Sequence, residues 1–276
     1  EALARHFQTE LFVLHVPQRD DPESAAYLAG QLRDLAGFVA AQTGRELDPE
    51  RLRASVELAN EARALLVQVG RLASHVPTPA KPREMNNMGF VASLLFGSED
   101  GVYLARTVRD IYSARVVAGE QGVPGERRRL LWVQNRIQFR SGLEEHLAEQ
   151  HQAAIVFDEL NEPWWEPIDP DDPFTALALR MIQNPLNGPV GRRVDRLVQN
   201  ARAYKVDGAI QPCHFGCRQG TGARGLITSG LREAGIPSLS LEIDCVDERN
   251  WAPGQVRTRV DAFLEMLPAR TLVPDA

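Results

Sequence analysis

The sequence of 276 residues predicts an α/β protein in which a helical middle region is followed by a doubly wound, mostly parallel sheet domain of Rossmann-like or flavodoxin-like type. Long amphipathic patterns with helix-start signals fill the first half of the chain. Short apolar runs then alternate with helical patterns, as a parallel sheet covered on both faces requires. The chain is 43% hydrophobic and 25% charged, which is ordinary for a folded globular protein.

The first half of the chain begins with an apolar run at residues 11–17, which predicts a strand. Aspartate–proline pairs at Asp21 and Asp48 predict the starts of two helices, each with proline at its first position. The proline-rich stretch at 75–89 predicts a loop, and a third helix is expected over 91–117. Because the strand begins so close to residue 1, we expect its partners to lie upstream, in a chain that is a fragment or a processed product.

The glycine-rich stretch GEQGVPGE predicts a linker between two domains. Residues 1–125 are expected to form the end of an N-terminal α/β domain plus the helical region, and residues 126–276 a C-terminal α/β domain with a ligand loop. Three consecutive arginines after the linker, Arg127 to Arg129, predict a solvated turn.

The strands and helices of the second half are expected to alternate along the chain. Strands are predicted at 130–133, 153–160, 208–212 and 237–244, and helices near 141–150, 224–234 and 254–267. Ligands of parallel sheets bind at the carboxyl ends of strands. We therefore expect the loops after the third and fourth of these strands to face one crevice.

Composition excludes several classes of function. The net charge of −6 argues against a nucleic-acid partner. No apolar run is long enough to span a membrane and no signal-peptide pattern is present, so a cytoplasmic location is expected. Three cysteines are too few, and odd in number, for a disulfide framework. Cys245, in an apolar and acidic run, is expected to be buried and inert.

The stretch QPCHFGCRQGTGARG, residues 211–225, is compatible with three chemistries. Gly220, Gly222 and Gly225 match a dinucleotide fingerprint, but its glycines should turn directly out of a strand, and a cysteine loop intervenes. Structural zinc lacks a second cysteine–histidine pair. Iron–sulfur ligation needs thiolates where amides and small residues approach the sulfides, which Gly216 and Gly220 beside Cys217 provide.

Three blocks of sequence carry a resemblance to a known family. HFGCRQGTG, AGIPSLSLEIDCVDERN and GQVRTRVDAFLEML resemble the C-terminal third of the 2-hydroxyacyl-CoA dehydratase D-component family, which is related to the benzoyl-CoA reductase subunits. FVLHVP, YLAGQLRDLAGFVAAQTGREL and RLLWVQNRIQF are similar, more loosely, to its middle region.

The resemblance implies a subunit of an oxygen-sensitive enzyme with a [4Fe–4S] cluster on three cysteines. The cluster would take one electron from an ATP-hydrolysing activator protein and pass it to an acyl-CoA, causing either loss of the 2-hydroxyl group or reduction of an aromatic ring. A sister subunit of the same family is the implied partner. The family's N-terminal domain is not matched here, so we expect cysteines outside this chain to complete the cluster.

The resemblance also implies site residues. Cys217 matches the family's C-terminal cluster cysteine, and neighbouring Cys213 is a second candidate metal ligand. Gly216 and Gly220 are candidates for the cofactor cradle. The candidate catalytic residues are His214, Arg218 and Gln219.

Other residues have competing interpretations. Trp164 and Trp165 are expected to form a packed corner rather than a stacking platform, and Glu159 a helix cap or solvated carboxylate rather than a proton-transfer group. Asn86 and Asn87 are turn residues or part of a pocket loop. Two other functions stay open: an accessory or electron-transfer subunit without its own complete cluster, and a nicotinamide-binding oxidoreductase.

Overall fold

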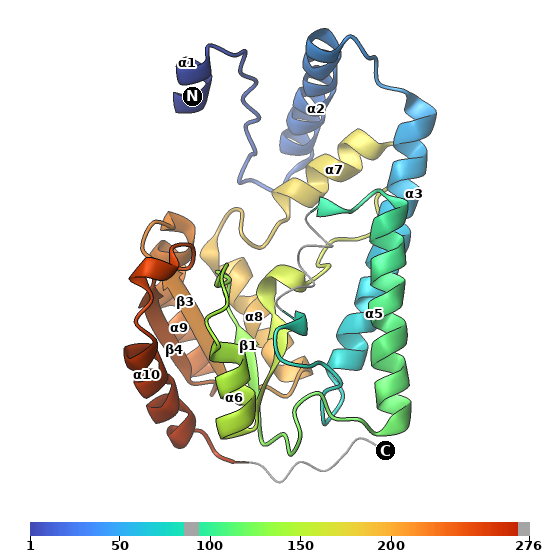
Figure 1. Cartoon of the computed structure of the whole chain (residues 1–276). Helices are drawn as coiled ribbons and strands as arrows, with labels where there is room; N and C mark the ends of the chain where they lie inside the picture. The colour runs from blue at the N-terminus through green and yellow to red at the C-terminus, as the bar shows by residue number, and fades with distance from the viewer. Residues whose placement is uncertain (86–93, 270–276) are drawn as a thin grey trace.

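A computed structural model describes residues 1–85 and 94–269 and has the α/β architecture that the sequence predicts (Figure 1). The strands are β1 (Arg128–Trp132), β2 (Ala153–Asp158), β3 (Gly208–His214) and β4 (Ser238–Ile243). They are parallel and ordered β2-β1-β3-β4. The order reverses between β1 and β3, since β2 lies outside β1 and β4 lies outside β3, as in flavodoxin-like sheets.

Helices cover both faces of this sheet. On one face α6 (Leu143–His151) and α10 (Pro253–Met266) pack over a core that includes Leu130 of β1. On the other face α8 (Val190–Ala203) and α9 (Arg218–Glu233) pack over a core that includes Leu131. Neighbouring residues of a strand point to opposite faces, so β1 must be apolar throughout. We call β1–β4 with these four helices the sheet domain.

The helical region consists of α2 (Pro22–Thr43), α3 (Pro49–Ala73) and α5 (Glu99–Ala118). The predicted starts are confirmed, because the side chains of Asp21 and Asp48 accept hydrogen bonds from first-turn amides of α2 and α3. The α5 helix begins later than predicted, at Glu99, because Ser98 caps it. Asn86 and Asn87 lie outside the described residues.

The prediction of a strand at residues 11–17 is wrong. After the short α1 (Ala2–Phe7), this segment runs irregularly beside α2. The side chain of Gln31 bonds both backbone groups of His15, at 2.9 Å each. A strand needs a neighbouring backbone to satisfy such groups, and here a side chain of α2 takes that place.

The α7 helix (Pro173–Ile182) follows β2 in sequence but packs on α2 (Figure 1). Its residues Ala178 and Ile182 are fully buried against Leu28 and neighbouring residues of α2. Short 3₁₀ turns at Glu159–Asn161 and Glu248–Asn250 complete the described elements. The division at about residue 125 stays a prediction, and the α2–α7 contact crosses it.

The prediction of a solvated arginine turn is wrong for Arg129. Its side chain lies on β1, fully buried and ion-paired with Glu126. It also donates to the carbonyls of Ser74 at 3.1 Å, His75 at 3.0 Å and Tyr204 at 2.8 Å. One guanidinium thereby joins the end of α3, β1 and the end of α8.

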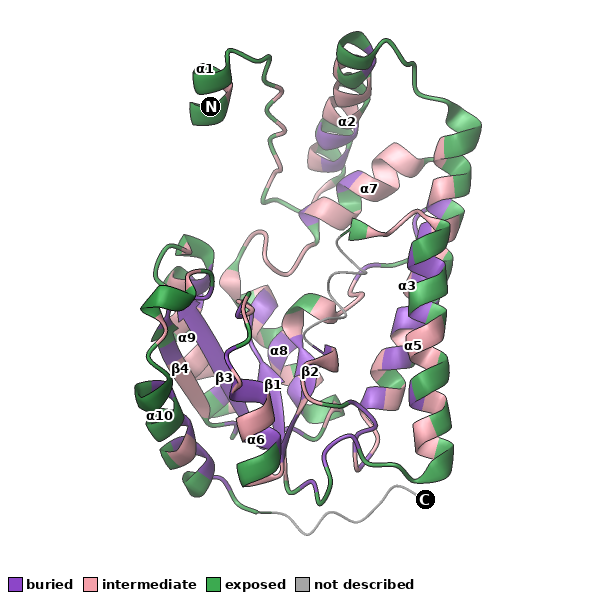
Figure 2. Ribbon diagram, in the orientation of Figure 1, coloured by how far each residue is buried: buried purple, intermediate pink, exposed green. Residues whose placement is uncertain are grey.

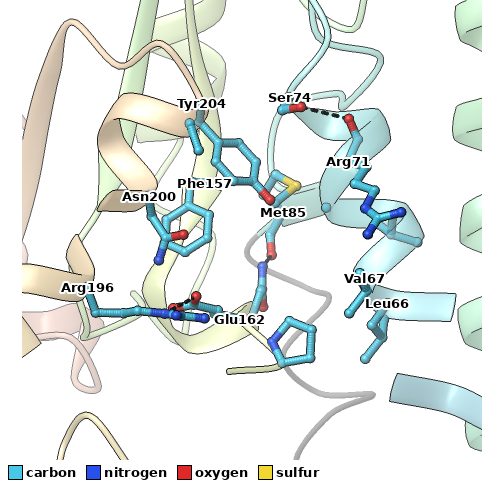
Figure 3. A pocket seen from close by; sticks show the side chains of 15 residues that line it. Leu66, Val67, Arg71, Ser74, Met85, Phe157, Glu162, Arg196, Asn200 and Tyr204 are labelled. Carbon is cyan, nitrogen blue, oxygen red and sulfur yellow. Dashed lines mark hydrogen bonds and ion pairs between the residues drawn. The ribbon is translucent and has the colours of Figure 1, made fainter. Parts of the chain in front are cut away.

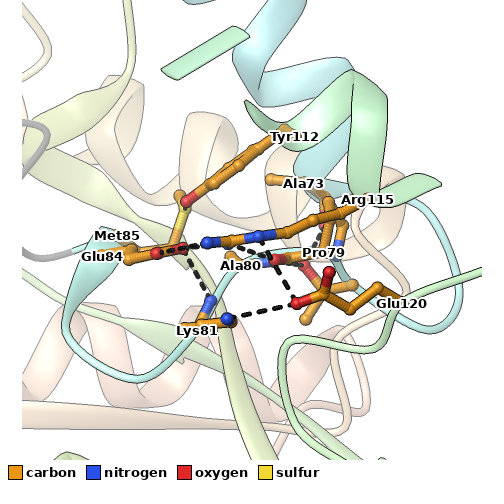
Figure 4. A network of polar contacts seen from close by, with 10 residues as sticks. Ala73, Pro79, Ala80, Lys81, Glu84, Met85, Tyr112, Arg115 and Glu120 are labelled. Carbon is orange, nitrogen blue, oxygen red and sulfur yellow. Dashed lines mark hydrogen bonds and ion pairs between the residues drawn. The ribbon is translucent and has the colours of Figure 1, made fainter. Parts of the chain in front are cut away.

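A second polar network holds the loop after α3 against α5 (Figure 4). Arg115 of α5 binds both carboxylate oxygens of Glu84, at 2.7 and 3.0 Å, and the carbonyl of Pro79 at 2.9 Å. Lys81 pairs with Glu120 at 3.1 Å. The network thus joins the loop after α3 to the C-terminal end of α5 within the helical region.

Burial is concentrated in the sheet domain (Figure 2). Six of the seven residues of β3 are buried, whereas α1 buries none. None of the described helices combines the length and apolarity needed to cross a lipid bilayer.

Candidate functional site

The site lies at the carboxyl edge of the sheet, where the strand order reverses between β1 and β3. Gln134 and Asn135 follow β1, and Cys217 follows β3. At such a reversal the adjoining loops diverge and leave a crevice. Gln134 has a φ of 59°, in the left-handed region that a residue with a side chain seldom adopts, which marks a locally strained backbone.

Cys217 caps the N-terminus of α9, which begins at Arg218 rather than at the predicted Arg224. Its Sγ accepts a hydrogen bond from the Gly220 amide at 3.4 Å and from Gln134 Nε2 at 3.7 Å. The residue is half-buried. The two N–H groups and the helix N-terminus direct partial positive charge at the sulfur, which suits a negatively charged sulfur ligand.

A buried ion pair fixes the orientation of Gln134. Arg193 of α8, only 2% exposed, donates to Gln134 Oε1 at 2.8 Å. Because a guanidinium has no acceptor, the amide oxygen must face Arg193 and the amide nitrogen must face Cys217. Glu159 holds Arg193 through two bonds of 2.6 and 2.8 Å. Glu159 is therefore neither the helix cap nor the solvated carboxylate expected from the sequence.

Two glycines around Cys217 allow close approach. A Cβ at Gly220 would lie 2.8 Å from Asn135 Nδ2, and one at Gly216 would lie 3.2 Å from His214 Nε2. Gly222 and Gly225 lie inside α9 with nothing within 4 Å of an added Cβ. The pattern G-x-G-x-x-G is thus part of a helix, and it does not form the turn out of a strand that a dinucleotide fingerprint needs.

His214 and Asp244 bring the ends of β3 and β4 together, as predicted. His214 Nδ1 lies 3.2 Å from the Cys245 amide and 3.5 Å from Asp244 Oδ1. One nitrogen cannot accept the amide proton and donate to the carboxylate at once, so the shorter contact favours a neutral ring protonated at Nε2. Hydrogen bonds from the Asp247 amide, then from the Asn250 side chain and a neighbouring amide, lower the pKa of Asp244 to about 2.

The other two cysteines are buried. Cys213 is 1% exposed, its Sγ lies 3.4 Å from the carbonyl of Gln211, and burial raises its pKa. Cys245 is 3% exposed, and burial followed by the charge of Asp244 raises its pKa to about 12. Of the three thiols, Cys217 is the one that the fold leaves partly exposed.

Two further candidate residues lie on the exposed first turn of α9. Arg218 and Gln219 are both exposed. Gln219 Nε2 donates to the carbonyl of Leu186 at 2.5 Å, which joins the cysteine loop to the segment before α8. That segment forms part of the wall of a cavity.

This cavity, of about 330 Å³, lies beside the cysteine loop and contains both polar and aromatic side chains. Arg193 and Leu186 line it together with Trp164 and Arg180. The Arg180 guanidinium stacks 3.8 Å from the ring centre of Trp165. Trp165 is 7% exposed, as the expected packed corner requires, and both Trp164 and Trp165 line the cavity.

A buried carboxyl group lies behind the same cavity. Arg136, which lines it, donates to Asp158 Oδ2 at 2.8 Å. Burial raises the pKa of Asp158 to about 6, and the charge of Arg136 opposes that rise. This group therefore titrates close to neutral pH.

A second cavity, of about 280 Å³, separates α3 from the sheet domain (Figure 3). Leu66 of α3 faces Phe157 and Tyr204 across it, and the pair Glu162–Arg196, bonded at 2.6 Å, borders both cavities. Its wall is more apolar than that of the first cavity, which contains Arg136, Arg180 and Arg193 and is called the arginine-lined cavity below.

Gln134 and Arg193 were not predicted as site residues. Gln134 directly follows a predicted strand at the sheet reversal, and this position could have identified it. Arg193 carries no such signal, because it lies within an amphipathic helix 59 residues away from Gln134.

The fold and site define a class of protein: a flavodoxin-like α/β protein that presents one cysteine at the reversal of its sheet. The family model described as 2-hydroxyglutaryl-CoA dehydratase, D-component, matches residues 1–267, and the chain belongs to this family. The resemblance seen in the sequence is thereby confirmed, and membership is consistent with a subunit of an acyl-CoA dehydratase. A comparison with curated proteins found no match.

Proposed function

We propose that this chain is a cytoplasmic subunit of an oxygen-sensitive enzyme that acts on CoA thioesters, by 2-hydroxyacyl-CoA dehydration or a related acyl-CoA reduction. Its proposed partners are a sister subunit of the same family and an ATP-hydrolysing activator protein. The observation that carries the proposal is the open, doubly hydrogen-bonded sulfur of Cys217 at the reversal of the sheet.

The residues around Cys217 fit one corner of a [4Fe–4S] cluster. Such a ligand needs an accessible sulfur, nearby N–H groups and small neighbours. Cys217 is half-buried, the Gly220 amide faces its sulfur, and Gly216 and Gly220 leave space. Cysteines outside this chain would supply further ligands, since Cys213 is buried in β3 and stays a weaker candidate. A bound cluster would supply one-electron chemistry.

The side chains around Cys217 would orient this cluster ligand and bind the thioester. Hydrogen bonds that run from Glu159 through Arg193 to Gln134 hold an N–H of Gln134 toward the Cys217 sulfur. His214, neutral with its proton on Nε2, offers a donor beside Gly216. We assign the acyl part of the thioester to the arginine-lined cavity, because Arg193 contacts both that cavity and the Gln134 amide.

A second candidate function is an accessory or electron-transfer subunit. The burial of Cys213 and Cys245 favours it, because the chain then offers a single accessible thiol. The nicotinamide alternative loses its support, since its glycines lie inside α9.

The test measures the iron and acid-labile sulfide content of protein that is purified anaerobically together with the subunits that accompany it. We expect iron near cluster stoichiometry, lost in Cys217→Ser and kept in the matched variant Cys245→Ala. Iron that survives Cys217→Ser would contradict the assignment of this ligand. Wild-type protein without iron, with all its subunits present, would favour the accessory function.

A further inference from the structure

A second group of metal-binding side chains lies between α6 and α10, away from the crevice. His146 and His151 of α6 both place Nε2 2.7 Å from the same oxygen of Asp261 on α10. The three ligand atoms lie within 4.8 Å of one another. His151 ends α6 immediately before β2, so the group lies toward the amino edge of the sheet, whereas Cys217 lies at the carboxyl edge.

We propose that His146, His151 and Asp261 form a binding site for a divalent cation of the zinc class. Imidazole nitrogen and carboxylate oxygen are ligands that Zn²⁺, Co²⁺ and Ni²⁺ accept. Three protein ligands leave a fourth position of a tetrahedral ion to water.

The geometry is close to what an ion needs. Metal–ligand bonds of about 2.0–2.1 Å in a tetrahedron separate the ligand atoms by about 3.3 Å. Each imidazole would therefore move from Asp261 by about 0.6 Å. The side chain of Asp261 is 38% exposed and those of the histidines 16% and 15%, so the carboxylate can turn and an ion can enter from solvent.

The charge arrangement also favours a cation. Asp261 contributes a carboxylate, and its Oδ1 lies 2.7 Å from Nε2 of both His146 and His151. A carboxylate oxygen with two imidazole nitrogens close to it already provides three of the ligand atoms that a cation needs. The ligands are on rigid elements, since Arg128 donates to the carbonyl of His151 at 3.2 Å and holds the end of α6.

The bound ion would join α6 to α10 over one face of the sheet. Leu147 and Val260 already pack these helices over the same core. A ligand that binds only the folded state stabilises it. Metal binding should therefore raise the melting temperature without touching the cysteine crevice.

The experiment uses the whole chain without a polyhistidine tag, freed of metal with a chelator and titrated with Co²⁺ alone. Wild-type protein should bind one equivalent with the visible spectrum of nitrogen and oxygen ligation, and without thiolate charge transfer. The spectrum should persist in Cys217→Ser and in His6→Gln, whose histidine lies on the exposed α1. It should be lost in His151→Gln and Asp261→Asn.

Zn²⁺ should displace the Co²⁺ and raise the melting temperature of wild-type protein, Cys217→Ser and His6→Gln, but not that of His151→Gln or Asp261→Asn. A wild-type protein that binds no Co²⁺ would overturn the proposal, as would equal binding by folded His151→Gln. His146→Gln serves as a replacement if either variant fails to give a native circular-dichroism spectrum.

Discussion

The helical region and the sheet domain place their arginines differently. In the helical region Arg53 and Arg106 form ion pairs in which the side chains of both partners are between 46% and 77% exposed to solvent. In the sheet domain the side chains of the Arg129–Glu126 pair are 0% exposed, and those of Arg193–Glu159 are 3% and 7% exposed. Exposed pairs contribute little to stability, whereas a buried pair is costly to break. We infer that the buried arginines fix where elements and site residues lie.

The largest expected effect is the loss of stability on replacing Arg129, which joins α3 to the sheet. Arg129→Ala should lower the free energy of unfolding by about 3–5 kcal/mol, because Glu126 is left buried without its counter-charge. Arg53→Ala, the matched exposed variant, should lower the free energy of unfolding far less, because its ion pair is exposed to solvent. Urea unfolding of both variants measures the difference. Similar losses in the two variants would remove the distinction between the regions.

Replacing Arg193 should reduce stability less than replacing Arg129 does, but it should change the environment of Cys217 specifically. Arg193→Lys cannot bind both oxygens of Glu159 and the Gln134 amide in the same way. Loss of such outer contacts typically weakens metal binding about 10–100-fold.

Iron retention by anaerobic protein under chelator challenge measures this effect, together with the midpoint potential of any bound cluster. The neighbouring Arg192, whose pair with Asp20 at 3.9 Å is partly exposed, provides the control Arg192→Lys. Equal iron retention and potential in the two variants would leave Arg193 a structural residue only.

The smallest effect concerns acid stability. The pKa of Asp244 in the sheet domain is lowered to about 2, from about 3.9 in an unfolded chain. Its contribution to stability is therefore complete above about pH 4 and is lost as the pH falls toward about 2. Asp244→Asn should lower the melting temperature at neutral pH and flatten its decline over that range.

Asp21 in the helical region provides the comparison. The Ser24 amide lowers its pKa as well, but asparagine caps a helix nearly as well as aspartate. Asp21→Asn should therefore change the melting temperature at neutral pH less than Asp244→Asn does. The reverse order would show that the exposed cap matters more than the hydrogen-bonded turn after β4.

Local signals in the sequence determined much of the fold. The caps at Asp21 and Asp48 act within one helical turn, and the alternation of strands and helices depends on periods of a few residues, so both could be predicted. The start of α9 was predicted at Arg224, but the helix begins at Arg218. The prediction was late because glycine weakens a helix and the first turns of α9 contain glycines. The Cys217 cap and the packing of Ile227 and Leu231 stabilise the helix despite them.

Only the tertiary structure decided which distant side chains meet. The sequence contains Arg193, Glu159 and Gln134 but gives no reason to join them. The same is true of Asp261 on α10, which lies 110 or more residues from His146 and His151 on α6. Residues 11–17 have the composition of a strand, yet a strand also needs a neighbouring backbone. Periodicity and capping are properties of neighbouring residues, whereas ion pairs and ligand groups depend on how whole elements pack.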